Sequence, residues 1–557
     1  MTSQELMDRL KQRFGEAIAS AREPAPGAVY LGIAPQAVGP IADCVSNEMG
    51  ARFLITTGTD ERPLPEGRFR VSHIFSFDQD KLFCILQTRV NGDDPEVDAI
   101  TPKVRGAMWA ERELFDVVGV KSRNHPDPRR LLLADDWPAG LYPLRKDVPF
   151  DIKPEPDFSA RPQLAEPPEG ASVLPIGPFF PVLEEPAYFR VFVEGETVVG
   201  CDYRGFYNHR GIEKLGDSAL TYNQVPFLAE RICGICGFIH STCYCQAVEQ
   251  AAEIEVPARA RFIRSLMLEL ERVHSHILWL GIAGHIIGFD TILMQAWRIR
   301  EPVMWLCEKI SGNRKTYGMN LVGGVRRDIP KEDHEEILGV VGKVEREMAE
   351  VIGAIVGDTP LIMRLKDVGP LPEKDAREIC VAGPTARGSN VAIDSRIDHP
   401  YAAYPEIGVE IKVQPGCDVL ARTLVRLEET MESIRQIRVA LHEMPDGPIM
   451  ARVDAIPAGR EGVSVVEAPR GEAIHYVLTG DDNHLYRWRV RAPTYPNLQA
   501  VPTMIQGQQI ADVPISIGSI DPCFSCTERM EVVDTRTQAV RVFSQQELLE
   551  LSRRSRR

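Results

Sequence analysis

The sequence has few cysteines for its length, lacks a long apolar run and has fewer basic than acidic residues, 64 against 79. Twelve cysteines among 557 residues are too few for a disulfide scaffold, and a net charge of −15 argues against non-specific binding to nucleic acid. The most apolar run, ILWLGIAGHIIGF, is interrupted by His285 and falls short of the ~20 apolar residues of a membrane span. The opening segment, MTSQELMDRLKQRFGEAIAS, lacks the continuous apolar core of a secretory signal. We therefore expect a cytoplasmic protein whose reduced thiols remain available as ligands.

The apolar pattern predicts an α+β protein in two parts. FRVSHIFSF and KLFCILQTRV read as a β-hairpin and predict a small α+β domain over 1–150. Residues 151–178 are rich in proline and predict a linker or an extended arm. A second hairpin is predicted at 187–203, and the pattern is β-like again over 462–494. Apolar residues at helical spacing predict long helices at about 224–252, 257–289, 291–312, 331–356 and 418–444.

Two C-x-x-C pairs stand about 290 residues apart. The first lies in RICGICGFIHS at 231–241 and the second in DPCFSC at 521–526. Together they offer four thiolates to one site, and soft thiolate ligands favour nickel, iron or copper(I). A structural zinc site, a redox disulfide and unligated thiols are the alternatives, although the wide separation is unlike that of a zinc ribbon.

Three further motifs accompany the cysteine pairs. HRGIEKL occupies 209–215, EAPRGE 467–472 and RAPT 491–494. Together with RICGICGFIHS and DPCFSCTER, and in the order in which all five occur along the chain, they resemble the motifs of nickel–iron hydrogenase large subunits. The resemblance implies a catalytic domain at 179–529. Its fold would be a large, mainly helical bundle with peripheral β-hairpins, the type shared with the 49-kDa subunit of respiratory complex I.

The N-terminal domain carries a second resemblance. ERELFDVVGVKSRNHPDPRRLLLADDW, followed by PLRKD, is similar to the 30-kDa subunit of complex I. Joined to a hydrogenase-like domain, it resembles the membrane-bound, energy-converting hydrogenases of the formate hydrogenlyase large-subunit type.

The hydrogenase resemblance implies a nickel–iron centre held by four cysteines. Cys233 and Cys523 would be terminal nickel ligands, while Cys236 and Cys526 would bridge nickel and iron. Carbon monoxide and cyanide would complete the coordination of the iron. A thiolate suits these positions because it is soft, charged and able to accept a proton from split hydrogen.

Four more residues are expected around this centre. His240, about one helical turn beyond Cys236, could donate a hydrogen bond to a bridging sulfur; the alternative is a histidine satisfied within the core. Arg470 resembles the arginine held over the open metal position, where it would polarise hydrogen or assist proton removal; the alternative is a buried ion pair. Pro493 and Thr494 resemble the loop that contacts the diatomic ligands of the iron, and the alternative is a plain loop hydroxyl.

The chain departs from the family pattern at two positions. Glu213, in the R-G-x-E motif, is the candidate for proton relay or for a distal ion site, with an ion pair as the alternative. Many relatives place a histidine at the end of the second cysteine motif, where it joins this glutamate in a metal site, but this chain has Arg529 there. An arginine cannot bind a cation, so we hypothesise a Glu213–Arg529 ion pair. Phe192 stands where many relatives have a proton-transferring glutamate, which leaves the proton path open.

None of the other cysteines has the spacing of an iron–sulfur site. The resemblance therefore implies that electrons pass to a small partner subunit that carries iron–sulfur clusters. It also implies membrane-arm subunits like those of complex I, a formate dehydrogenase module, and attachment through these partners to the cytoplasmic face of the inner membrane. We interpret the remaining cysteines as small apolar core residues: Cys44, Cys84, Cys201, Cys243, Cys245, Cys307, Cys380 and Cys417.

The predicted activity is the reversible conversion of hydrogen to two protons and two electrons, with net proton reduction in a formate-hydrogenlyase setting. The alternative is a metal-free, complex I-like connecting subunit with a quinone site, although such subunits have lost the four cysteines. Residues 530–557 resemble an extension that an endoprotease removes once a maturation chaperone has helped to insert the metal. The equivalent bond here is Arg529–Met530, and the alternative is a permanent C-terminal arm.

Overall fold

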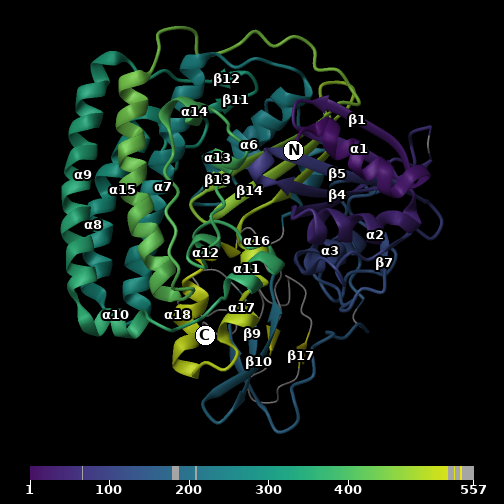
Figure 1. The fold of residues 1–557 in the computed structure, drawn as a ribbon, viewed down its shortest axis with the longest axis horizontal. Coiled ribbons are helices and arrows are strands. Elements are labelled where there is room, and N and C mark those ends of the chain that lie inside the picture. Colours follow the sequence, from purple (N-terminus) through teal and green to yellow (C-terminus); the bar gives the residue numbers. More distant parts are fainter. Residues whose placement is uncertain are drawn as a thin grey trace, which may run out of the picture.

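A computed structural model describes residues 1–65, 67–157, 159–177, 187–206 and 210–524, and the short strands β16 (Val532–Val533) and β17 (Val540–Arg541). A sheet-based N-terminal part joins a mainly helical part, which confirms the predicted α+β class (Figure 1). None of the helices in these ranges combines the length and the apolar character needed to cross a bilayer.

A five-stranded sheet forms the N-terminal domain. Its elements are α1 (Ser3–Phe14), β1 (Ile18–Ala25), β2 (Ala28–Ile33), α2 (Val38–Asp43), β3 (Arg52–Asp60), β4 (Arg68–Phe77), β5 (Leu82–Asn91), β6 (Glu96–Asp98), α3 (Met108–Val118) and β7 (Lys121–Arg123). The sheet has the order β1-β2-β5-β4-β3, and β4 with β5 is the hairpin predicted from the sequence. A capping box between Thr2 and Glu5 begins α1.

Four long helices form a bundle at the opposite side of the molecule (Figure 1). They are α7 (Ala258–Ile286), α8 (Asp290–Ser311), α9 (Lys331–Gly357) and α15 (Val419–Glu443), and all lie within three residues of predicted bounds.

The single helix predicted at 224–252 is wrong. The segment is split into α5 (Val225–Ala229) and α6 (Gly237–Ala251), with the first cysteine pair in the turn between them. The helix is interrupted because the backbone N–H groups of Ile235 and Cys236 donate to the sulfur of Cys233 instead of to helical carbonyl groups.

A three-stranded antiparallel sheet lies between the bundle and the N-terminal domain. Its strands are β13 (Glu461–Ala468), β14 (Gly471–Thr479) and β15 (Leu485–Arg491). Every residue of β13 and β14 is buried, and α6 packs against both strands. This hairpin is therefore central, whereas the sequence predicted hairpins at the periphery of the bundle.

A second three-stranded sheet contains the other predicted hairpin, β9 (Tyr188–Glu194) and β10 (Thr197–Arg204). Its third strand, β8 (Ser172–Ile176), pairs with β9, so the end of the predicted linker is a strand. Shorter elements complete the C-terminal part: α4 (Ile212–Gly216), β11 (Asn320–Leu321), β12 (Gly324–Val325), α10 (Thr359–Leu365), α11 (Glu373–Ile379), α12 (Pro384–Arg387), α13 (Ser395–Asp398), α14 (Tyr404–Ile407), α16 (Thr494–Leu498), α17 (Val501–Ile505) and α18 (Val513–Gly518).

Three buried arginines of β15 bind the edge strand of the N-terminal sheet. Arg487, Arg489 and Arg491 alternate along β15, so their side chains leave the same face. Their Nε groups donate to alternate carbonyl oxygens of β3, from Gly58 to Leu54, at 3.0, 3.3 and 3.2 Å. The guanidinium groups thereby satisfy backbone acceptors that an edge strand would otherwise leave open.

Candidate functional site

The two cysteine motifs meet in the interior of the molecule. Cys233 and Cys236 lie in the turn before α6, and Cys523 follows α18. The Sγ atoms of Cys233 and Cys523 are 3.4 Å apart, although 290 positions separate them in the sequence. All three side chains are buried. The fourth predicted thiolate, Cys526, lies outside the described residues.

Backbone groups of the turn favour a charged sulfur at Cys233. The N–H groups of Ile235 and Cys236 lie 3.4 and 3.3 Å from its Sγ atom, and such donors stabilise a thiolate. The neighbouring Cys233 sulfur and burial raise the pKa of Cys236, whereas the positive charge of Arg470 lowers it. Within the described ranges, no group of three or more histidine, cysteine, aspartate or glutamate side chains meets the geometry of a metal site.

Arg470 lies in the turn between β13 and β14, beside the cysteines. Its Nε and Nη2 groups donate to the carbonyl oxygen and to Oδ1 of Asp521, at 2.7 and 2.9 Å, and Nη1 lies 3.3 Å from the hydroxyl of Ser275. Its charge interacts with all three buried cysteines. The sequence interpretation missed Asp521 as the partner, although it stands two residues before Cys523 in the second motif.

A chain of hydrogen bonds fixes the tautomer of His240. The indole N–H of Trp488 donates to Nδ1 of His475 at 3.1 Å, so Nε2 of His475 carries the proton and donates to Nδ1 of His240, also at 3.1 Å. The proton of His240 is therefore on Nε2. Burial lowers the pKa of His240 to about 4, so the ring is neutral at pH 7.

Thr494 holds the second cysteine motif by its backbone. The N–H of Cys523 donates to the hydroxyl of Thr494 at 3.1 Å. Pro493 directly precedes this threonine, which begins α16. The hydroxyl proton of Thr494 is not used in that bond, and its predicted contact with a ligand of the iron stays a prediction.

Glu213 forms ion pairs with two arginines, which is the alternative that the sequence left open. Its carboxylate pairs with Arg487 at 2.8 Å and Arg489 at 3.0 Å, and it accepts the N–H of Val490. Burial acts to raise the pKa of Glu213, but the two guanidinium groups outweigh it and hold the pKa below its usual range. Arg529, the partner hypothesised from the sequence, lies outside the described residues.

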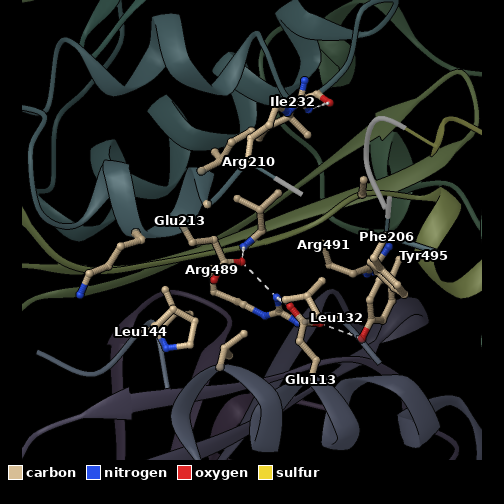
Figure 2. Close-up of a pocket in the computed structure, with 17 residues that line it drawn as sticks. Glu113, Leu132, Leu144, Phe206, Arg210, Glu213, Ile232, Arg489, Arg491 and Tyr495 are labelled. Atoms are coloured by element: carbon tan, nitrogen blue, oxygen red, sulfur yellow. Dashed lines mark hydrogen bonds and ion pairs between the residues drawn. The ribbon is translucent and has the colours of Figure 1, made fainter. Parts of the chain in front are cut away.

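Figure 2 shows Glu213 at the wall of a cavity between the two domains. The cavity has a volume of about 120 Å³. Glu113 of α3 approaches from the N-terminal domain and Ile232 from the cysteine turn. The cavity is lined mainly by apolar side chains, and Arg489 joins two of its charged groups, Glu113 and Glu213.

Most of the remaining sequence candidates lie in the core. Phe192 is buried on β9, with the guanidinium of Arg190 5.5 Å from the centre of its ring. Five of the other cysteines are buried and three are partly exposed: Cys44, Cys84, Cys243, Cys245 and Cys307 in the first group, Cys201, Cys380 and Cys417 in the second.

A short segment that the sequence interpretation missed holds the first cysteine turn in place. The hydroxyl of Tyr317 donates to the carbonyl oxygen of Cys233 at 2.9 Å, and the N–H of Gly318 donates to the carboxylate of Glu230 at 2.8 Å. Tyr317 can approach this closely only because Gly237 has no side chain. A Cβ atom there would lie 2.2 Å from Cε1 of Tyr317 and 2.6 Å from the carbonyl oxygen of Glu230.

Gly237→Ala is therefore expected to lower the free energy of unfolding by about 1–3 kcal/mol, the usual cost of an overpacked core. Urea unfolding monitored by circular dichroism measures the change. Gly339→Ala is the matched control, because Gly339 is exposed in α9 with nothing within 4 Å of the added atom. This control should gain roughly 0.5–1 kcal/mol from helix propensity. An equal gain at Gly237 would contradict the close approach of Tyr317.

Three family models match the chain. The model of the respiratory-chain NADH dehydrogenase 30 Kd subunit matches residues 31–154, and that of nickel-dependent hydrogenases matches 210–284. The model of the respiratory-chain NADH dehydrogenase 49 Kd subunit matches 287–459 and 454–529.

Curated relatives match almost the whole chain. Formate hydrogenlyase subunit 5 of Escherichia coli (strain K12) is 41% identical over 90% of this chain and 89% of its own length. The chain belongs to the formate hydrogenlyase subunit 5 family. Hydrogenase-4 component G of the same organism is 39% identical over 95% of this chain and 93% of its own length. Membrane-bound hydrogenase subunit alpha of Pyrococcus furiosus is 40% identical over 68% of this chain and 92% of its own length.

A solved structure of a respiratory membrane complex is also similar to this chain. A chain of the membrane-bound sulfane sulfur reductase (MBS), an archaeal respiratory membrane complex, matches with a TM-score of 0.61 and 29% identity. The match covers 65% of this chain and all of that chain. Both resemblances predicted from the motifs, to hydrogenase large subunits and to the 30-kDa subunit of complex I, are therefore confirmed for this member of the formate hydrogenlyase subunit 5 family.

Proposed function

We propose that this chain is the catalytic large subunit of a nickel–iron hydrogenase, which interconverts hydrogen with two protons and two electrons. The 3.4 Å approach of Cys233 and Cys523 carries the proposal, because it joins the two motifs that would supply the metal ligands. The match of residues 210–284 to nickel-dependent hydrogenases supports it.

The residues of the site fit a nickel–iron group. Three buried thiols, with Cys526 proposed as the fourth, are the soft ligands that suit nickel and iron. Nε2 of His240 and Oδ2 of Asp521 have no hydrogen-bond partner in the described part of the chain, and buried polar atoms normally have one. When bound, the group, with carbon monoxide and cyanide on its iron, would supply the heterolytic cleavage of hydrogen.

The protein's own side chains would then orient the site and stabilise its charge. Arg470 presents a permanent cation that Asp521 and Ser275 hold in place, and a fixed cation stabilises negative charge on nearby sulfurs. His240 would donate Nε2–H towards a sulfur, because Trp488 and His475 set its tautomer. Thr494 keeps the backbone of Cys523 in register with the first motif.

The relatives support an assembly with membrane-bound partners. We propose that electrons pass to an iron–sulfur subunit, and that membrane-arm subunits and a formate dehydrogenase module complete the complex at the cytoplasmic face of the inner membrane. The names of the relatives, a membrane-bound hydrogenase and a formate hydrogenlyase, favour this arrangement. Net proton reduction is the proposed direction.

A metal-free, complex I-like connecting subunit is the second candidate. The match of residues 287–529 to the 49 Kd subunit favours it. The buried cysteines favour the hydrogenase, since a connecting subunit has no use for thiols at this place.

Metal analysis of the purified protein separates the two candidates. The hydrogenase proposal expects about one nickel per chain and infrared bands of metal-bound carbon monoxide and cyanide. Zinc alone would indicate a structural site, and the absence of any metal would support the connecting subunit. The intact mass of the same preparation tests the proposed removal of residues 530–557, since active protein of full length would contradict it.

A further inference from the structure

A fully buried carboxyl group lies beneath the first cysteine turn. Glu271 belongs to α7, and its side chain is 0% exposed. Its two oxygens accept the backbone N–H groups of Phe238 and Ile239, both at 3.0 Å, at the start of the helix that follows Cys236. A third contact, of 2.9 Å, joins Oε1 to the hydroxyl of Thr316.

The hydroxyl of Thr316 has more acceptors than protons. It faces both the carboxyl of Glu271 and the carbonyl oxygen of Lys315 at hydrogen-bonding distance. A hydroxyl carries one proton, and a carbonyl oxygen only accepts. When Thr316 donates to Lys315, the contact with Glu271 is a hydrogen bond only if Glu271 carries a proton and donates it.

The charges around Glu271 differ from those around its neighbour on the same helix. Glu269 pairs with Arg272 and Arg396, which hold its pKa at about 2 against the effect of burial. In the described part of the chain, no arginine or lysine forms an ion pair with Glu271. Burial therefore raises the pKa of Glu271 to about 8, although its hydrogen bonds act in the opposite direction. The other titratable groups whose charges interact with Glu271 are Cys233, Cys307, Lys315 and Tyr317.

The backbone at Thr316 is strained. Its φ angle is +63°, in the left-handed region that a β-branched residue rarely adopts. Such strain costs on the order of 1–3 kcal/mol and persists where the surroundings enforce it. Here the bonds of Tyr317 to Cys233 and of Gly318 to Glu230 enforce it from the next two residues. The strained conformation places the hydroxyl between its two acceptors.

We propose that Glu271 is the group that takes up and releases the proton of the hydrogen reaction, and that the hydroxyl of Thr316 turns to serve both of its protonation states. The inference rests on the proposed function. It replaces Glu213, which two arginines keep charged, as the candidate proton carrier.

Only O–H bonds change in the proposed step. Neutral Glu271 donates to Thr316, and Thr316 donates to the carbonyl oxygen of Lys315. After Glu271 has released its proton, Thr316 turns and donates to the carboxylate, which the N–H groups of Phe238 and Ile239 also stabilise. In hydrogen oxidation Glu271 accepts the proton from hydrogen cleavage at the cysteine site and then releases it to water. In proton reduction Glu271 takes the proton from water and passes it to the cysteine site.

Infrared titration of the whole protein tests the protonation state directly. The difference spectrum between wild type and Glu271→Gln should contain the C=O band of a protonated carboxyl at pH 7. That band should disappear as the pH rises through about 8. Its absence at pH 7 would overturn the proposal, whether or not the preparation contains metal.

Exchange between D₂ and water tests the role in catalysis. Glu271→Gln should keep its nickel and slow the exchange by about 10²-fold, the usual contribution of a positioned acid or base. Thr316→Val should slow it as well, while Thr316→Ser should restore it. Thr423→Val is the control, because within the described residues that buried hydroxyl donates to the helical carbonyl oxygen of Val419 and lies apart from Glu271 in the sequence. If Glu271→Gln binds no nickel, the exchange rate of Thr316→Val tests the proposal instead. Unchanged exchange in a nickel-loaded variant refutes the proposal, whereas wild type without nickel would refute the proposed function.

Discussion

Replacement of Cys523 by serine is expected to abolish hydrogen turnover and to reduce nickel to the background of the measurement. The Sγ atom of Cys523 lies 3.4 Å from that of Cys233. Within the described residues, Cys523 is the thiol that the second cysteine motif supplies to the site. A hydroxyl does not replace a soft thiolate as a nickel ligand. The loss should exceed the roughly 10–100-fold cost of removing an outer partner of a ligand. Elemental analysis and hydrogen evolution with a reduced dye measure both effects.

Cys84→Ser is the matched control for this variant. Cys84 is as deeply buried but belongs to β5 of the N-terminal sheet. It should keep its nickel and its turnover, with at most a modest loss of stability. Full nickel content in Cys523→Ser would show that the second motif does not bind the metal.

Arg489→Met is expected to lower the free energy of unfolding by about 3–5 kcal/mol, the usual cost of removing one partner of a buried ion pair. Arg489 binds Glu113 of the N-terminal domain through two bonds, at 2.5 and 2.8 Å, and Glu213 of the C-terminal part at 3.0 Å. Methionine fills a similar volume but leaves Glu113 without its cation. Urea unfolding measures the loss, and limited proteolysis between the domains should become faster.

Arg438→Met is the control, because it shows how much unfolding free energy is lost when an arginine of an exposed ion pair is replaced. Arg438 forms an exposed pair with Glu345 at the bundle surface, and such pairs contribute no more than about 1 kcal/mol. Equal losses in the two variants would contradict a special role for Arg489 at the domain boundary.

Periodicity was sufficient to predict the long helices but not the polar contacts that position the site. The apolar pattern of 258–286 defines α7 because a buried helix repeats its contacts every turn. That pattern does not distinguish Glu269 from Glu271, two residues apart on one helix. Against the effect of burial, the pKa of Glu269 is lowered by Arg272 and by Arg396, which comes from another part of the chain. Burial raises the pKa of Glu271.

In the candidate site, too, the motifs could be predicted from the sequence but the contacts between distant residues could not. The cysteine motifs could be identified from spacing and order, and the structure brings Cys233, Cys236 and Cys523 together. The tautomer of His240 depends on His475 of β14 and on Trp488, and no local signal in the sequence connects these residues. For Glu213 the sequence left a proton relay, a distal ion site and an ion pair open, because its motif says nothing about the arginines of β15 that bind it.

The arginines of β15 lie in a sequence pattern that does not reveal their burial. LYRWRVR alternates charged and apolar residues, which is typical of a strand with one face in water. The charged face is instead buried against β3, where backbone carbonyl groups and carboxylates replace the water.

This arrangement has a consequence during synthesis. The bond from Arg487 to Gly58 spans 429 positions of the chain. At about 5–20 residues per second, the ribosome needs roughly 20–90 s to make the arginines after β3 has emerged. Throughout that interval the nascent N-terminal sheet exposes an unprotected edge, which is a template for pairing with other chains. We expect the growing polypeptide to depend on chaperones, and a fragment that ends before β15 to aggregate even though its own sheet is complete.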